Sequence, residues 1–82
     1  MHMNRDEVLK KVNKVFNEIF DDDNLKIKDE TTANDIEDWD SLTHITLISS
    51  IEEEFNIKFD MSDIVNFKNV GDMIDAIIKK LK

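Results

Sequence analysis

The sequence predicts an all-α fold: a four-helix bundle with three longer helices, a short third helix and a long loop after the first helix. Two observations lead to this prediction. The 82 residues include no proline and a single glycine, whereas strand-rich domains use both residue types to build their turns. Three segments also repeat apolar residues at spacings of three and four, which is the period of one helix face. A chain of this length suits one compact core, so we expect residues 1–82 to form a single domain.

The first helix is expected over Arg5–Phe20. Asn4, followed three residues later by Glu7, has the form of a capping box, which satisfies free backbone N–H groups at a helix start. Residues 21–40 then form a long connection without sustained periodicity, in which residues 25–28 are a candidate strand with no clear partner. Scattered apolar side chains are expected to pin this connection across the helices. The apolar face of the first helix comprises Val8, Leu9, Val12, Val15, Phe16, Ile19 and Phe20.

The second helix is expected to start at Asp40 or Ser41, either of which can cap the first amides, and to run to Phe55. Most apolar residues of this helix lie near one stripe. Its residues are Leu42, Ile45, Ile48, Ile51, Glu52 and Phe55, with Leu47 beside them.

Two further helices complete the predicted bundle. Ser62 is expected to cap a short third helix over residues 63–67, and Asn69 a fourth over Val70–Leu81. Met61 and Met73 stand at helical positions and are expected to fill the core.

The composition is strongly acidic, with a formal net charge of −8 and no cysteine. Such a surface repels nucleic acid and anionic membranes, and it favours protein partners with basic patches. Without a long apolar run or a signal-like segment, we expect a soluble cytoplasmic monomer that does not insert into membranes. The residues Met1-His2-Met3 have the form of a cloning scar before a native start at Met3, and they receive no role.

The segment Trp39-Asp40-Ser41-Leu42 opens a helix that closes in Ile51-Glu52-Glu53-Glu54-Phe55-Asn56-Ile57. This pattern resembles the signature of acyl and peptidyl carrier proteins, an Asp-Ser-Leu site followed by a helix ending in Leu/Ile-Glu-Glu-x-Phe-x-Ile. The resemblance extends over nearly the whole chain. Length, acidity and helix layout agree with it, and agreement at several levels is stronger evidence than the tripeptide alone.

The resemblance implies that the Ser41 hydroxyl accepts 4′-phosphopantetheine from coenzyme A and that Asp40 helps to place the metal ion during this transfer. The thiol of the attached arm would hold an acyl or aminoacyl group as a thioester. The carrier itself would perform no catalysis. The partners implied are a phosphopantetheinyl transferase, an acyl- or aminoacyl-loading ligase, and downstream acyltransferases or synthases.

The chain departs from many fatty-acid carriers, which have glycine and a small residue before Asp-Ser-Leu where this chain has Glu37-Asp38-Trp39. Thr46 and Ser49 also stand where fatty-acid carriers often have an acidic and an apolar residue. These departures resemble stand-alone carriers of specialised pathways and count against a housekeeping role in fatty-acid synthesis. Lipid, polyketide, nonribosomal peptide and cell-envelope pathways all stay open.

Partner docking is expected around the attachment point. Leu42 is expected to be exposed as an apolar contact, with core packing as an equal alternative. Trp39 is equally well explained as an anchor of the long loop, and the Glu52–Glu54 run as a solvated helix end. The predicted docking residues are Asp38, Trp39, Leu42, Ile45, Thr46, Glu52 and Glu53.

Rival interpretations are a non-catalytic acidic helical adaptor, in which Ser41 is only a helix cap, and two kinds of functional site. His44 lies three residues after Ser41, but a hydrolase would need an orienting group and an oxyanion loop, so a solvated helix histidine is expected. The run Asp21-Asp22-Asp23 lacks the glycine and glutamate positions of a calcium-binding loop. No metal site is therefore expected.

Overall fold

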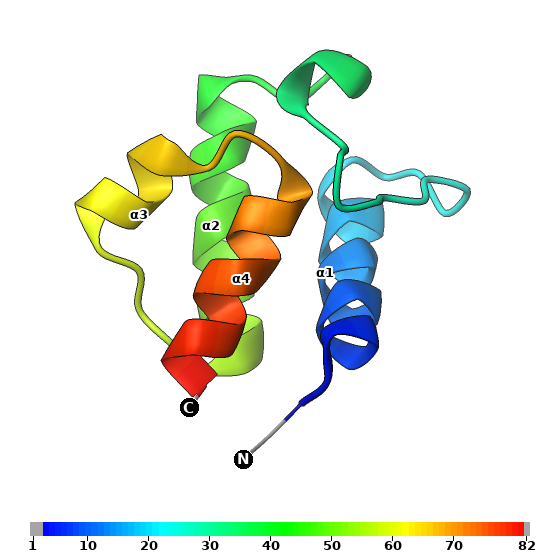
Figure 1. Cartoon of the computed structure of the whole chain (residues 1–82). Coiled ribbons are helices and arrows are strands. Elements are labelled where there is room, and N and C mark those ends of the chain that lie inside the picture. Colours follow the sequence, from blue (N-terminus) through cyan, green and yellow to red (C-terminus); the bar gives the residue numbers. More distant parts are fainter. Residues whose placement is uncertain (1–2, 82) are drawn as a thin grey trace.

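The computed structural model describes residues 3–81 and contains helices only, so the predicted all-α class is confirmed for this part of the chain. Figure 1 shows that α1 runs opposite to α2 and α4, and that the shorter α3 lies on the side of α2 away from α1. The predicted Met1-His2 scar lies outside the described residues. The elements are α1 (Arg5–Ile19), a 3-10 turn η1 (Ala33–Asp35), α2 (Ser41–Phe55), α3 (Met61–Asn66) and α4 (Val70–Leu81).

Side-chain caps fix where the helices begin. At α1 the predicted capping box is present: Asn4 Oδ1 accepts from the Glu7 N–H at 2.8 Å, and the Glu7 carboxylate accepts from the Asn4 N–H. At α4 the predicted cap is also present, since Asn69 Oδ1 accepts from the Asp72 N–H at 2.8 Å. The prediction for the end of α1 was one residue too long, because Phe20 is the C-cap.

The predicted start of the third helix was wrong. The helix begins at Met61 and not at residue 63, and its N-cap is Asp60 instead of Ser62. The Asp63 carboxylate reaches back to the Asp60 N–H at 3.2 Å, which is the reciprocal half of a capping box. Two acids three residues apart therefore outcompete a serine between them as the start signal.

One hydrophobic core joins α1, α2, α4 and the long loop. Met73 is fully buried in it, as predicted, whereas the prediction for Met61 was wrong because that side chain is 74% exposed at the start of α3. The largest fully buried side chains are Phe16, Leu47, Ile51, Met73, Ile74 and Ile77.

The long loop is held in place by asparagine side chains of α1. Asn13 donates to the Leu25 carbonyl at 3.0 Å and accepts from the Ile27 N–H at 2.7 Å. Asn17 donates to the carbonyls of Leu25 and Asp22. Residues 25–28 thus form no strand, and two of them bond to helix α1 instead. Ile27, whose N–H is satisfied in this way, is buried.

The single glycine lies where this loop meets α4. The Gly71 N–H donates to the Asp29 carbonyl at 2.8 Å, and a Cβ added at residue 71 would approach that carbonyl oxygen to 3.1 Å. The close approach of two backbones therefore explains the glycine.

Asn13→Ala is expected to lower the free energy of unfolding by about 1–3 kcal/mol, since the part-buried Ile27 N–H loses its only close acceptor. Urea unfolding followed by circular dichroism measures the change. The control is Asn66→Ala, an exposed asparagine at the end of α3, for which a change within about 0.5 kcal/mol is expected. Equal values for the two variants would contradict the pinning role.

Candidate functional site

Ser41 is the first residue of α2 and its side chain is exposed. The cap of the helix is Asp40: its carboxylate accepts from the Thr43 N–H at 2.9 Å, while Thr43 Oγ1 accepts from the Asp40 N–H at 2.7 Å. Of the two predicted caps, Asp40 is therefore the one observed. The Ser41 hydroxyl stands beside the unpaired N–H groups of a helix start, where an anionic substituent is electrostatically favoured.

The cap changes the acidity of Asp40. Hydrogen bonds from the backbone N–H and then the hydroxyl of Thr43 lower the pKa of the Asp40 carboxyl below its ordinary value, because both stabilise the ionised form. The carboxylate is thus kept charged next to Ser41.

Asp40→Asn is expected to lower stability at pH 7, and the deficit is expected to shrink in acid. Because the folded-state pKa of Asp40 is depressed, its contribution is complete above the unfolded-state pKa of about 4 and is lost as the pH falls through the lower folded-state pKa. Urea midpoints for the two proteins, measured from neutral pH to about pH 2 across this window, test the prediction. A deficit that stays constant with pH would contradict the charged cap.

The N-terminal half of α2 presents apolar side chains to solvent. Leu42 is 75% exposed and Ile45 is 63% exposed, with Thr46 also exposed beside them. Leu42 therefore has the predicted exposure and not the alternative core position. The apolar stripe of α2 is therefore divided along its length. Leu42 and Ile45 are exposed, whereas the later residues enter the core, which contains Leu47, Ile48, Ile51 and Phe55.

Trp39 and His44 form a pair that brackets the start of α2. Trp39 is buried and packs edge-to-face on Phe16, with ring centroids 5.2 Å apart. Its Nε1–H donates to His44 Nδ1 at 3.1 Å, and the two rings are stacked. His44 is thus a half-buried partner of Trp39 and not the solvated histidine predicted.

A sequence signal for this pair exists and was missed. With Asp40 as N-cap, Trp39 precedes the cap and His44 is the fourth helical residue. These are the two positions of a hydrophobic staple, in which the flanking residue packs onto the first turn.

An open groove of about 630 Å³ lies beside Ser41, between α2 and α3. We call it the α2–α3 groove. Its lining includes Ser41, His44 and Ile45 from α2, Ile64 and Val65 from α3, and Lys68 from the α3–α4 connection. Apolar and basic side chains therefore line the same groove, beside the exposed Ser41.

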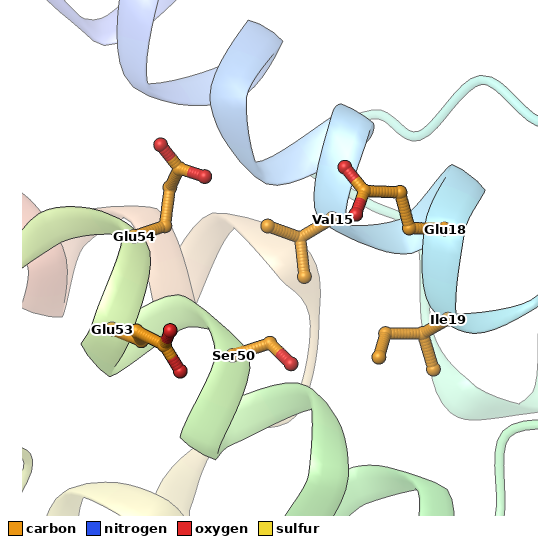
Figure 2. Close-up of a pocket in the computed structure, with 6 residues that line it drawn as sticks. All are labelled: Val15, Glu18, Ile19, Ser50, Glu53 and Glu54. Atoms are coloured by element: carbon orange, nitrogen blue, oxygen red, sulfur yellow. The ribbon is translucent and has the colours of Figure 1, made fainter.

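The predicted docking glutamates lie at the opposite end of α2. The Glu52 carboxylate accepts from the Phe59 N–H at 2.8 Å, so this side chain already has an internal partner, whereas Glu53 is exposed. Figure 2 shows Glu53 with Glu18 and Glu54 around a separate hollow of about 330 Å³ between α1 and α2. The structure therefore does not bring Glu52 and Glu53 next to Ser41, while Asp38 is exposed just before it.

Among residues 3–81, no cluster of three or more histidine or acidic side chains is arranged to hold a metal ion. Within the same range, no helix is both long and apolar enough to cross a membrane.

Comparison with known proteins agrees with this geometry. The family described as "Phosphopantetheine attachment site" matches residues 10–77. The chain is 32% identical over 77 residues to the acyl carrier protein of Thermotoga maritima, covering 94% of this chain and 95% of that protein. It is 35% identical over 75 residues to that of Streptococcus thermophilus, covering 92% and 97%.

A solved structure is also similar: the solution NMR structure of the holo acyl carrier protein of Geobacter metallireducens. The TM-score is 0.85 and the sequences are 44% identical, over 90% of this chain and 85% of that one. This similarity confirms the predicted four-helix arrangement.

Membership in this family fixes the general role of the chain. Its prosthetic group is covalently attached 4′-phosphopantetheine, and the exposed hydroxyl of a serine at a helix start fits such a group. Acyl carrier proteins catalyse no reaction themselves and work with a phosphopantetheinyl transferase and with acyl-processing enzymes. The chain belongs to the acyl carrier protein family of phosphopantetheine-bearing carriers.

Proposed function

We propose that Ser41 is the attachment point and that the chain presents acyl or aminoacyl thioesters to the enzymes of one biosynthetic pathway. The observation that carries the proposal is that Asp40, and not Ser41, caps the start of α2. Asp40 caps the helix, so the adjacent hydroxyl of Ser41 is exposed and has no capping task. A bulky substituent on this oxygen can extend into water without disturbing the core.

Attachment is a phosphoryl transfer. The Ser41 oxygen bonds to the β-phosphorus of coenzyme A, the bond from that phosphorus to the bridging oxygen of the diphosphate breaks, and adenosine 3′,5′-bisphosphate leaves. The hydroxyl proton passes to a base of the transferase. Asp40, kept ionised by Thr43, would supply a carboxylate to the magnesium ion of the transferase complex. Once attached, the group supplies the thiol on which acyl groups are held as thioesters.

Partner docking is proposed for the exposed face of α2 next to Ser41. Leu42 and Ile45 offer apolar contact, Thr46 lies beside them, and Asp38 adds negative charge at the helix start. Trp39, which precedes this face, packs against Phe16 of α1 and anchors the start of the helix. Glu53, with Glu52 beside it, would steer basic partners from the far end of the helix and raise the association rate more than the affinity.

The proposed setting is a stand-alone, single-domain carrier of the cytoplasm. The partners proposed are an acyl- or aminoacyl-loading ligase and downstream acyltransferases or synthases of a lipid, polyketide, nonribosomal peptide or cell-envelope pathway. The residues before Asp-Ser-Leu favour a specialised pathway over housekeeping fatty-acid synthesis.

The deciding experiment is to incubate the protein with coenzyme A, magnesium and a broad-specificity transferase and to measure its intact mass. One phosphopantetheine adduct is expected, and tandem mass spectrometry should place it on the peptide that contains Ser41. An unmodified protein that instead forms a stable complex with a basic partner would support the rival adaptor function and overturn the proposal.

A further inference from the structure

The α2–α3 groove contains two basic side chains beside Ser41, in a chain whose formal net charge is −8. One is His44 on α2 and the other is Lys68 on the α3–α4 connection. Lys68 is exposed, and the ion pairs found among residues 3–81 involve Arg5, Lys11 and Lys80 but not Lys68. Lys68 thus forms no ion pair within this range, and it lines both the α2–α3 groove and a neighbouring hollow that contains Asp63, Asp72 and Asp75.

The backbone holds Lys68 in this place. Its N–H donates to the Asp72 carboxylate at 3.0 Å, and two residues later the Val70 N–H donates to the Thr31 carbonyl at 2.9 Å. Figure 1 shows this connection passing across the end of the bundle at which α2 begins. The backbone of Lys68 is therefore fixed at the edge of the groove.

The hydrogen bond from Trp39 determines what His44 offers to the groove. Because Nδ1 accepts the indole N–H, the proton of the neutral imidazole is on Nε2. The imidazole therefore presents a donor, and not an acceptor, at its other nitrogen. Stacking on the buried Trp39 ring fixes its orientation.

His44 is one helical turn from Ser41, and residues three apart on a helix have Cβ atoms about 5–6 Å apart. A phosphate bonded to the Ser41 oxygen is thus within reach of the His44 donor. The groove also contains one acidic residue, Asp40, whose carboxylate accepts from the Thr43 N–H and stays ionised. A phosphate on Ser41 therefore lies near one negative charge, and the donors of His44 and Lys68 would have to offset it.

We propose that His44 and Lys68 bind the phosphodiester of the phosphopantetheine group attached to Ser41, so that the arm starts along the α2–α3 groove. The proposal rests on Ser41 being the attachment point. The apolar residues Ile45, Ile64 and Val65 would line the path beyond the phosphate. His44 and Lys68 are positioning residues for the arm.

The test is ³¹P NMR of the fully modified protein, in a His2→Gln background so that His44 is the only imidazole. We expect the ³¹P resonance of the phosphodiester to move by more than its linewidth when His44→Gln is added at constant pH, because the substitution removes the imidazole donor that we place against the phosphate.

Lys68 is tested with a matched control. Lys68→Met is expected to move the ³¹P resonance at constant pH, whereas Lys58→Met, an exposed lysine beside a different hollow, should leave it in place. Adding inorganic phosphate to the unmodified protein is expected to leave the His44 ¹⁵N resonances unchanged at millimolar concentration, which would separate tethered from free phosphate.

Each outcome is decisive. A ³¹P resonance that stays in place in the His44→Gln protein, or equal shifts for the two lysine variants, overturns the proposal while leaving attachment to Ser41 intact. Absence of the adduct in the intact mass overturns attachment and this inference together. Equal binding of free phosphate by the unmodified protein would show a general anion site and overturn the specific role in the arm.

Discussion

Ser41→Ala is expected to keep the mass of the unmodified protein after incubation with coenzyme A, magnesium and a transferase, whereas the parent protein gains one phosphopantetheine. The reason is chemical, because alanine has no oxygen to bond to phosphorus. The loss should be complete, and longer incubation should not restore it. Intact mass spectrometry measures both proteins side by side.

The fold makes this variant unusually clean. Asp40, and not Ser41, caps α2, and the Ser41 side chain is exposed. Removing its hydroxyl should therefore change the free energy of unfolding by no more than about 0.5 kcal/mol. Unfolding of the variant would then not explain the loss of the adduct. Ser49→Ala is the matched control, an exposed serine two turns along the same helix, and it should be modified like the parent. An adduct on Ser41→Ala would place the attachment point elsewhere.

Helix positions were predictable because local chemistry sets them. The capping box at Asn4 and the cap at Asn69 are short-range hydrogen bonds that a sequence displays directly. The third helix shows the limit of this reasoning: Asp60 and Ser62 are both good caps, and only the reciprocal bond from Asp63 decides between them.

The buried face of α2 was harder to predict because apolar residues surround much of the helix. Leu42, Ile45 and Ile48 follow one another along the helix, but only Ile48 is buried, together with Leu47 and Ile51. The choice depends on where α1 and the long loop pack, which is information from distant parts of the chain. The two apolar residues left outside are the ones next to Ser41.

The attachment serine was predictable from its motif, whereas its surroundings were not. The meeting of His44 with Lys68 joins residues from α2 and the α3–α4 connection, and no local pattern links them. The contact of Trp39 with His44 did follow a local rule, the staple across a helix start. The sequence predicts that Trp39 is either a docking residue or a loop anchor, and its burial against Phe16 favours the anchor.

Trp39→Ala is accordingly expected to cost about 3–5 kcal/mol of unfolding free energy, the range for removing a buried large aromatic side chain. It removes the edge-to-face contact with Phe16 and leaves His44 Nδ1 without its donor. Small domains have little stability in reserve, so much of the variant should be unfolded at 25 °C. Because Trp39 is the sole tryptophan, urea unfolding has to be followed by circular dichroism.

Leu42→Ala and Trp39→Phe are the control variants for this prediction. Leu42 is 75% exposed, so its truncation should change stability by no more than about 0.5 kcal/mol, although the two residues are only three apart. Trp39→Phe keeps an aromatic ring against Phe16 but loses the indole donor, and it should fall between the other variants. If Trp39→Ala were as stable as Leu42→Ala, Trp39 would not anchor the loop, and the fixed orientation of His44 next to Ser41 would lose its physical basis.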